Sequence, residues 1–575
     1  MLLELCLAAV IPIFVFLFPG AGDRVFRKLE RHLSQFASRR GVAVVASFFL
    51  AMLLRIAVLP VEPIPAPAVH DEFSYLLMAD TFAHGRLTNS TPPFWWHFET
   101  LHENMRPTFC SKFFPAQGIF LAAGQVVFGH PFWGVVLTLG LMAATTCWAM
   151  QGWMPPGWAL LGTFLVVVHL GVFGYWANSY WGGTVAASGG ALVIGAFARL
   201  KRRQSPLYAI VLAIGLVFLA NTRPYEGLIF SVPVLVLLIV FYGRKKQWSI
   251  TLRQVILPAA AVIACAAVCM AYYFWRTTGK PYLPPYAVYS ATYDSVPFVP
   301  WRTIKDVPHY SNKVMENFYL GYSRYQYLLY RGSPHFFLIV RAFIFWNFFI
   351  GSLLSVPFFA VCIVLPYGIG LRDLPPKVLE IFFITGCGVL AIVPIVFFNP
   401  HYAAPVLCSL YILLMFIMRR VWIWNGRQTD TGKGLVRTLV LACATLLASK
   451  ISAGTLKIPP TWLDSPGNGS LQMTERSRIL SSFQNSPVKE LIIVRYSSDH
   501  DPTDEWVYNE ANIESAKLVW ARELDPSSNG QLVEHFKDRQ IWLLQPDQVP
   551  PKLEKYPAND SPAVTSMDAA SRRTH

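Results

Sequence analysis

Long apolar runs separated by short polar stretches make up most of the chain from its first residue to about residue 452. A helix needs roughly 17 to 25 mostly apolar residues to cross the hydrocarbon core of a bilayer, and several of the runs approach that length. The pattern therefore predicts a mainly α-helical, polytopic transmembrane bundle of about 12 to 13 hydrophobic segments. We place these segments at 1–19, 41–60, 114–128, 131–150, 157–175, 183–199, 206–222, 227–242, 254–275, 347–368, 378–398, 403–419 and 434–452.

The final stretch of the chain, 453–575, has the composition of a soluble protein. Strand-like runs at 491–496 and 540–544 flank a helical stretch near 512–522, a pattern that predicts a small α/β domain of unknown role. Three parts are thus expected: an N-terminal membrane segment with a basic cytoplasmic linker (1–40), a membrane domain (41–452) whose long external loops are 62–113 and 276–335, and the C-terminal domain (453–575).

The positions of the charged residues along the chain are more informative than the net charge. The 575 residues include 48 Lys and Arg against 33 Asp and Glu, a net charge of +15. The basic residues gather in short stretches between apolar segments, at 24–40, 199–203, 244–246 and 419–420. Such clusters mark the cytoplasmic side of a membrane protein, so no nucleic-acid partner is expected.

This orientation places both long loops and the C-terminal domain on the external face of the membrane. Thirteen complete crossings that begin outside cannot also end outside, and the mismatch falls between 131 and 199. We therefore expect one segment there, 157–175, to be a partial crossing. Eight of the nine cysteines lie in apolar segments and Cys110 lacks an obvious external partner, so no disulfide framework is predicted.

The candidate chemistry begins with Asp71 and Glu72, which stand side by side just after the segment 41–60. A carboxylate at the membrane surface can take a proton from an acceptor hydroxyl. Apolar residues then recur at helical spacing as far as Gly85, which predicts a helix lying along the membrane surface. Asp71 also stands where a helix N-cap would, with Ser74 three residues later, so the roles of base and cap are both open and do not exclude each other.

Two stretches resemble a known family. They are His70-Asp71-Glu72-Phe73-Ser74-Tyr75, continuing through Asp80 to Gly85, and Ser111-Lys112-Phe113-Phe114-Pro115 with Gly118 at the start of the next segment. Together they resemble the GT-C glycosyltransferases, and more narrowly the bacterial branch related to protein mannosyltransferases and lipid A aminoarabinose transferases. The resemblance covers roughly 40–420 and not the C-terminal domain. Phe113 and Phe114 stand where that family has prolines directly after the lysine.

The resemblance implies a GT-C-like enzyme of the inner (plasma) membrane. It would move a sugar from a polyprenyl-phosphate donor to an acceptor at the external face, the acceptor being a glycan, a lipid or a protein. Asp71 would be the base, Glu72 would orient the acceptor or assist, and Lys112 would contact the donor phosphate. One base suffices for a direct, inverting displacement, whereas hydrolytic glycosidases use two opposed carboxylates.

A departing phosphate requires positive charge near the external face. Arg223 and Glu226 stand at an external segment end, where they either serve the donor phosphate or form a structural ion pair. His401, beside Tyr402, either contacts phosphate or is an interfacial turn histidine. Arg106 precedes a proline and is either a phosphate contact or a solvated charge.

No His or Cys cluster has metal-ligand spacing, so no metal-binding residues are predicted, although an Asp-Glu pair can recruit a divalent cation. The expected partners are the lipid-linked donor, its acceptor and the bilayer. The alternative function is a polytopic membrane transporter or lipid flippase, which would also carry intramembrane charges and broken helices. That class predicts related halves, and the sequence has no clear internal repeat.

Overall fold

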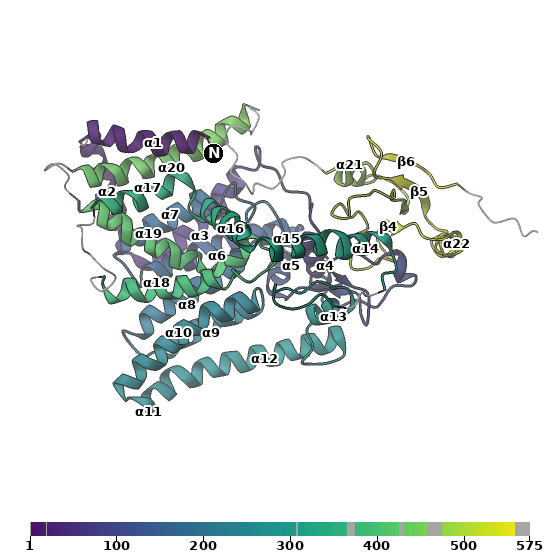
Figure 1. Ribbon diagram of the computed structural model, residues 1–575, viewed down its shortest axis with the longest axis horizontal. Helices are drawn as coiled ribbons and strands as arrows, with labels where there is room; N and C mark the ends of the chain where they lie inside the picture. Colours follow the sequence, from purple (N-terminus) through teal and green to yellow (C-terminus); the bar gives the residue numbers. More distant parts are fainter. Residues whose placement is uncertain are drawn as a thin grey trace, which may run out of the picture.

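The computed structural model describes residues 2–18, 20–305, 309–364, 374–424, 430–456 and 474–557. Helices dominate the described part of the chain and gather in one bundle, while a small sheet lies beyond one end of it (Figure 1). The apolar helices of the bundle are α1 (Leu2–Leu17), α3 (Arg40–Ala57), α5 (Ala116–Phe128), α6 (Phe132–Met150), α7 (Pro156–Leu170), α8 (Thr184–Leu200), α9 (Pro206–Ala220), α10 (Pro224–Lys245), α12 (Leu257–Thr278), α16 (Pro334–Phe349), α17 (Gly351–Val364), α18 (Pro376–Leu390), α19 (Leu407–Trp422) and α20 (Thr431–Thr455).

The predicted fold class is confirmed, and every predicted segment overlaps one of these helices. Within the described residues, six helical stretches are long and apolar enough to cross a membrane, or seven if the pair α16 and α17 counts as one span. These six are Arg40–Ala57, Phe132–Met150, Pro224–Lys245, Trp248–Thr278, Pro400–Trp422 and Thr431–Thr455. The helix α7, in the region where a partial crossing is expected, is one of the shorter apolar helices.

The predicted external loop 276–335 and the segment 347–368 differ from the structure. The loop region contains α13 (Pro285–Thr292), α14 (Lys313–Glu316), η3 (Asn317–Ser323) and α15 (Arg324–Gly332), and α16 begins inside it. Gly351 has a φ of 66°, a left-handed conformation that glycine adopts at little cost. It separates α16 from α17, and the two helices bend by 99° there. The apolar pattern runs across the break and therefore does not reveal it.

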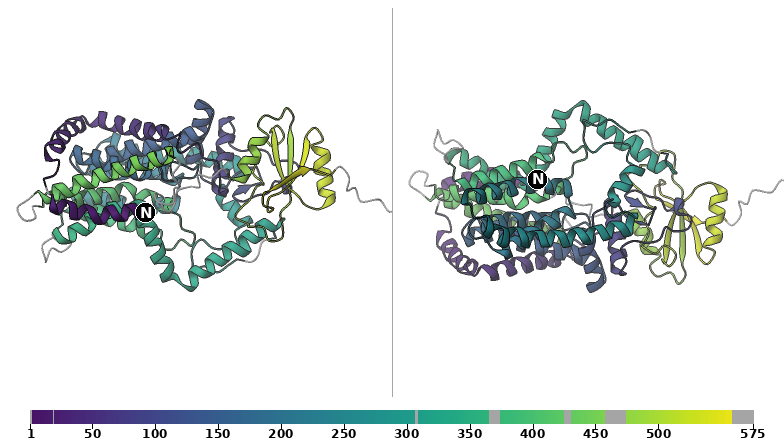
Figure 2. Two further views of the ribbon diagram at one scale, coloured as in Figure 1. Left: turned by 90° about the horizontal axis from the view of Figure 1, so that it is seen from above. Right: turned by 90° about the horizontal axis from the view of Figure 1, so that it is seen from below.

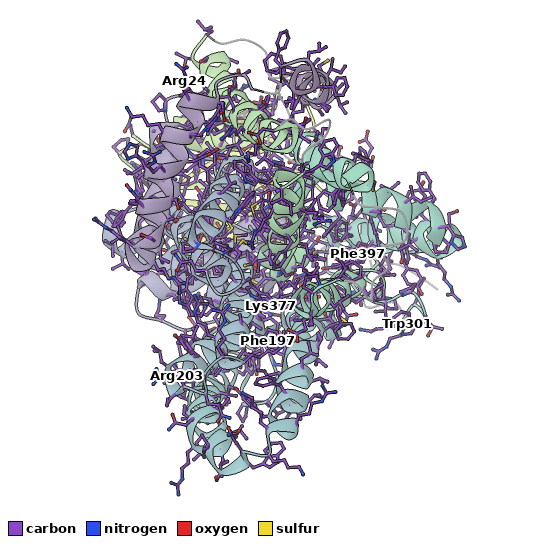
Figure 3. The ribbon with its side chains drawn as sticks, turned by 90° about the vertical axis from the view of Figure 1, so that its left-hand side faces the viewer. Arg24, Phe197, Arg203, Trp301, Lys377 and Phe397 are labelled. Atoms are coloured by element: carbon purple, nitrogen blue, oxygen red, sulfur yellow. The ribbon has the colours of Figure 1, made fainter. Side chains whose placement is uncertain are left out.

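The basic stretches and the sheet lie at opposite ends of the bundle. Helix α2 (Asp23–Ser38) and the short helix α11 (Trp248–Thr251), which follows the basic 244–246 stretch, lie at the left-hand end in Figure 1. Figure 3 views the molecule from that end, with Arg24 labelled near the top and Arg203 in the lower left part. This arrangement agrees with the charge distribution from which we inferred the orientation.

The region after α3, which is predicted to be external, is built around α4 (His70–Ala83), and this confirms the helix expected there. Gly85 follows the helix with a φ of 71°, a common helix ending. Eight side chains of α4 are buried, because the helix lies between the bundle and the sheet (Figure 1). The rest of the region is the short helix η1 (Trp95–His97) and the antiparallel strands β1 (Glu103–Asn104) and β2 (Cys110–Ser111).

The C-terminal domain is a four-stranded sheet in the order β4-β3-β5-β6. Strands β4, β3 and β5 are parallel, and β6 runs antiparallel to β5. Both predicted strand runs are confirmed, but the helix expected near 512–522 is wrong: Leu518–Arg522 is a strand, because it pairs with β3 inside the sheet. The elements are α21 (Glu475–Ser482), β3 (Glu490–Val494), β4 (Leu518–Arg522), α22 (Pro526–His535), β5 (Gln540–Gln545) and β6 (Lys552–Lys555).

The C-terminal domain shares a hydrophobic core with the region around α4. Leu77 of α4 and Phe98 of the loop belong to the same buried cluster as Leu491 and Ile493 of β3 and Leu532 of α22. Figure 2 shows, from above and from below, the sheet at the end of the bundle where this loop region lies. The domain is therefore packed onto the region around α4.

Candidate functional site

Asp71 is the second residue of α4, and it does not cap the helix. The N-cap is Val69, whose backbone is extended. Glu72 accepts hydrogen bonds from the backbone N–H groups of Ala68 (2.8 Å) and Val69 (3.2 Å), the arrangement of a capping box. Ser74 Oγ donates to the carbonyl oxygen of His102. The capping alternative for Asp71 is therefore wrong, and the helix start is stabilised by its neighbour.

Glu72 also ties α4 to the bundle. Its second carboxylate oxygen accepts a hydrogen bond of 3.0 Å from the backbone N–H of Tyr180, which lies between α7 and α8. The side chain is only 4% exposed. Burial raises the pKa of Glu72, and the backbone donors oppose that rise. With both oxygens occupied by backbone donors, this carboxylate fixes the position of the helix rather than facing a substrate.

Asp71 points to an imidazole that the sequence analysis missed. His102 Nδ1 lies 2.9 Å from Asp71 Oδ1, and the Asp71 side chain is 23% exposed. The contact does not meet hydrogen-bond geometry at Nδ1, so it is an electrostatic contact. Burial alone would raise the pKa of Asp71, but His102, Lys112 and His401 together outweigh it and hold that pKa below its usual range. Asp71 is therefore a carboxylate at neutral pH.

The backbone of His102 is held on both sides. Its φ of 68° is left-handed, its N–H donates to Tyr289 Oη at 2.8 Å, and its carbonyl accepts from the Lys112 N–H at 3.1 Å. Burial and the positive charge of Lys112 lower the pKa of His102, while its contact with Asp71 opposes that effect. Nothing in the local sequence singled out this histidine, because its partner Asp71 lies in a different element.

Lys112 lies beside this pair in an aromatic enclosure. Its Nζ is 4.7 Å from the centroid of the Tyr289 ring, 5.3 Å from that of Phe113 and 5.6 Å from that of Tyr286. The residue is 8% exposed. Burial lowers the pKa of Lys112, while Asp294 and Asp71 oppose that effect. Within the described ranges no carboxylate lies close enough to form an ion pair with it, so this ammonium is suited to an anionic ligand.

Arg223 is the second cation of the site. Its guanidinium carbon lies 4.2 Å from the centroid of the Tyr402 ring. Arg223 and Glu226 are not in direct ion-pair contact in the described part of the chain, although each acts on the charge of the other, so both alternatives for this pair stay open. Arg223 does feel the negative charges of Glu226 and Asp71, both of which raise its pKa against the effect of burial. The charges of Asp71, Lys112 and Arg223 therefore share one neighbourhood.

His401 lies on the short helix η5 (Pro400–Val406) and is buried. Its Nδ1 is 2.8 Å from Tyr175 Oη, and its backbone N–H donates to the same oxygen at 3.0 Å. The other ring nitrogen, Nε2, is buried and has no hydrogen-bond partner. The Trp181 ring lies edge-on to the imidazole at 4.7 Å. A buried position with one free nitrogen differs from the interfacial turn histidine that we considered.

Arg106 lies apart from these residues. It is exposed, and its guanidinium carbon lies 4.3 Å from the centroid of the Trp95 ring. No hydrogen bond or ion pair links it to Asp71 or Lys112 in the described structure. This placement is that of a solvated charge resting on an aromatic ring.

The described residues contain no group of three or more His, Cys, Asp or Glu side chains that could hold a metal ion. A divalent cation prefers several oxygen ligands, of which carboxylates are the strongest. Because Glu72 is occupied by backbone donors, Asp71 is the one carboxylate of the Asp-Glu pair that is free to act at this site. The Asp-Glu pair is thus a poor fit for a divalent cation.

No protein-family model matches the sequence, and no curated protein matches it significantly. Similar solved structures include ArnT from Cupriavidus metallidurans bound to undecaprenyl phosphate, with 12% identity and a TM-score of 0.48 over 87% of this chain and 92% of that one. They also include the Archaeoglobus fulgidus oligosaccharyltransferase tethered with an acceptor peptide, with 10% identity and a TM-score of 0.45 over 87% of this chain and 68% of that one. Both are GT-C membrane glycosyltransferases. At such identities and TM-scores, a function has to be argued from the site itself.

Proposed function

We propose that this chain is an integral membrane glycosyltransferase. It transfers a sugar from a polyprenyl-phosphate donor to an acceptor hydroxyl at the external membrane face, with Asp71 as the base. The observation that carries the proposal is the pairing of one ionised, partly exposed carboxylate with two cations, Lys112 and Arg223, that have no ion-pair partner in the described structure. This set matches the two charges that such a reaction must handle, a proton released and a phosphate expelled.

The reaction needs one proton acceptor. As the acceptor oxygen attacks the anomeric carbon, its proton passes to a carboxylate oxygen of Asp71. The bond between that carbon and the donor phosphate oxygen breaks, and the phosphate leaves with the electron pair. A direct displacement of this kind inverts the anomeric configuration and needs no second carboxylate. The occupation of Glu72 by three backbone N–H groups supports a single-base mechanism.

The lipid-linked phosphate would lie against the cations. Aromatic rings lie against Lys112 and Arg223, and neither cation has an ion-pair partner in the described structure, which favours binding of a phosphate. His401 Nε2 is an additional candidate contact, because it is buried and has no partner in the described structure. In the tautomer that carries its proton on Nε2, His401 would donate a hydrogen bond to a phosphate oxygen.

The external location of the reaction rests on charge. The basic stretches lie at one end of the bundle, and the site and the C-terminal domain lie towards the other (Figure 1). Since clusters of Lys and Arg mark the cytoplasmic side, this supports an external site in the plasma (inner) membrane. The acceptor is a hydroxyl of a glycan, a lipid or a protein.

The test is transfer of radiolabelled sugar from polyprenyl-phosphate donors in membranes that contain wild-type or Asp71→Asn protein at matched abundance. We expect a loss of about 10²- to 10⁴-fold in rate, because the amide keeps the shape of the side chain and cannot accept the proton. Glu316→Gln is the control, since it changes an exposed carboxylate on the external side that pairs with Lys313. Equal transfer by wild type and Asp71→Asn would rule out Asp71 as the base.

One observation favours the second candidate, a transporter or lipid flippase. The 99° bend between α16 and α17 is a broken span of the kind that such proteins use. Reconstituted vesicles separate the two functions, because a flippase moves a fluorescent polyprenyl-phosphate lipid across the bilayer without any acceptor, whereas the enzyme forms no new glycosidic bond until an acceptor is added. Lipid movement without sugar transfer would favour the flippase.

A further inference from the structure

The C-terminal domain reaches the first turn of α4. Tyr508 Oη lies 3.1 Å from His70 Nδ1, and His70 directly precedes Asp71. The Tyr508 ring stacks on the ring of Phe73 at 4.1 Å between centroids, with 2° between the planes. The residue is buried. One tyrosine therefore contacts the turn of α4 that carries the proposed base, both through a hydrogen bond and through its ring.

An arginine fixes this tyrosine in place. Arg476 donates from Nε to the carbonyl of Trp506 and from Nη2 to the carbonyl of Tyr508, each at 2.9 Å. Its guanidinium carbon also lies 4.7 Å from the ring centroid of Phe73 and 4.7 Å from that of Trp520. The Arg476 side chain thus links α4, which carries Phe73, to β4, which carries Trp520. It also holds the backbone of residues 506–508 between these two elements.

Further contacts anchor the domain along the same helix and its loop. The backbone N–H of Ala511 donates to Asp80 Oδ2 at 2.9 Å, near the other end of α4. Arg522 donates from Nη1 to the carbonyl of Glu99 at 2.6 Å and also forms a buried ion pair with Glu505. These contacts accompany the shared hydrophobic core. The orientation of α4 is therefore fixed by the domain at both ends of the helix.

His70 connects this contact to the site. Its ring meets the His102 ring edge-on, with 5.6 Å between centroids, and His102 is the residue that contacts Asp71. Burial, reinforced by His102, lowers the pKa of His70 to about 3, so the ring is neutral and its bond to Tyr508 is a neutral hydrogen bond. This bond fixes the orientation of a ring that packs against the partner of the base.

We propose that Tyr508 is a positioning residue and that the C-terminal domain completes the catalytic site through it. By holding His70 and Phe73, Tyr508 sets the geometry of the turn that carries Asp71 and of the imidazole beside it. The inference rests on the proposed glycosyl transfer, and it assigns to the domain a role that its own sequence does not indicate. A small displacement of a catalytic group is enough to slow a reaction substantially.

The test uses the full-length protein with Tyr508→Phe, which keeps the ring stacked on Phe73 and removes the hydroxyl group. We expect kcat to fall about 10-fold while the KM for the lipid-linked donor stays unchanged, because the donor phosphate contacts Lys112 and Arg223. Tyr282→Phe is the matched control, since Tyr282 is 76% exposed and lies outside the C-terminal domain. Rates are referred to the amount of folded protein, measured by size-exclusion chromatography in detergent, so that a loss of fold is not counted as a loss of kcat.

A second measurement does not depend on activity. Hydrogen exchange of the peptide that contains residues 70–83 should become faster in Arg476→Gln, which weakens the link between the sheet and Phe73, and remain unchanged in Arg478→Gln, which changes an exposed arginine of the same helix. If wild type transfers no sugar, the proposed function fails and the exchange result still tests the coupling. If wild type is active and Tyr508→Phe retains its full kcat, the positioning role is overturned. Unchanged exchange in Arg476→Gln would likewise overturn the coupling of the domain to α4.

Discussion

At the scale of single residues, the site is defined by how each charge is compensated. Asp71 is balanced by surrounding nitrogen atoms, which hold its pKa below the usual carboxyl range against the effect of burial. The carboxylate oxygens of Glu72, the adjacent acidic residue, accept hydrogen bonds from three backbone N–H groups. These two neighbouring acidic residues thus differ in how free their oxygens are, because only Glu72 has both oxygens occupied by the backbone.

The contact with His102 predicts a pH effect. His102→Asn removes the ring and tolerates the left-handed backbone at this position, because asparagine adopts positive φ more readily than most residues. Burial then raises the pKa of Asp71 with one opposing group fewer. A base acts only when it is ionised, so the acid limb of the rate against pH should move to higher pH than in wild type, where it lies below about pH 4.

The measurement is the rate of sugar transfer between pH 3 and pH 8, in buffers of constant ionic strength. His335→Asn serves as the control, because His335 is exposed on α16. An acid limb at the same pH in both variants would show that His102 does not act on Asp71.

Replacing Lys112 should weaken donor binding without lowering the stability of the folded protein. Lys112→Met retains a long side chain and removes an ammonium that lacks an ion-pair partner in the described structure, so the folded protein should be as stable as wild type or slightly more so. The loss of a charge-assisted contact to phosphate should raise the KM for the donor about 10-fold or more, since such bonds contribute about 1.5 to 3 kcal/mol.

Transfer kinetics and thermal unfolding in detergent test both parts, with the exposed Lys280→Met as the control. A lower unfolding temperature together with an unchanged KM would mean that Lys112 serves the fold and not the donor.

At the scale of elements, close helix approaches hold the site together. Gly190 of α8 faces η5, the short helix that carries His401. A Cβ at this glycine would lie 2.1 Å from the carbonyl oxygen of Pro405. Because this oxygen belongs to the backbone, a change of side-chain rotamer cannot relieve the clash. The glycine therefore sets the separation between α8 and η5, as small residues do at helix contacts in membranes.

Gly190→Ala should consequently destabilise the protein by about 2 kcal/mol or more through overpacking. Gly386→Ala in α18 is the matched control, since a Cβ there meets nothing within 4 Å and alanine favours a helix over glycine by about 0.5 to 1 kcal/mol. Thermal unfolding in detergent should show a lower midpoint for the first variant and no decrease for the second. Equal midpoints for the two variants would contradict the close approach.

At the scale of the whole molecule, the distribution of charge and the position of the C-terminal domain indicate the same orientation of the protein in the membrane. The basic stretches and the sheet lie at opposite ends of the bundle (Figure 1). The loop after α3, α4 and the C-terminal domain form one packed unit at the end away from the basic stretches. If the proposed function is correct, this unit lies where the two substrates meet at the membrane surface.

The orientation predicts different chemical accessibility at the two ends. A cysteine introduced by Glu534→Cys on α22 should react with a membrane-impermeant maleimide in intact cells. One introduced by Lys246→Cys, in the basic stretch after α10, should react only after permeabilisation. Wild type supplies the background from its native cysteines. Labelling of Lys246→Cys in intact cells would reverse the predicted orientation.

The sequence by itself determined the membrane class, the positions of the apolar segments, the helix that carries Asp71 and two strands of the C-terminal sheet. These features were predictable because they depend on local properties, namely the length of apolar runs, helical spacing and the alternation of residues in a strand. The sequence also singled out Arg223 and His401, because charged or titratable side chains at the ends of apolar segments are costly unless something compensates them, whereas Lys112 was implied by the resemblance to the GT-C glycosyltransferases.

Only the tertiary structure decided how these parts combine. It identified His102 as the partner of Asp71 and placed Tyr508 against His70, a contact between residues 438 positions apart. It assigned the capping role to Glu72, changed a predicted helix into β4 and divided one apolar stretch at Gly351. Each of these depends on which segments pack together, and such contacts between remote residues leave no periodic pattern in a single sequence. The local sequence therefore identified the charged residues as candidates, and the packing of the chain determined the contacts that each of them makes.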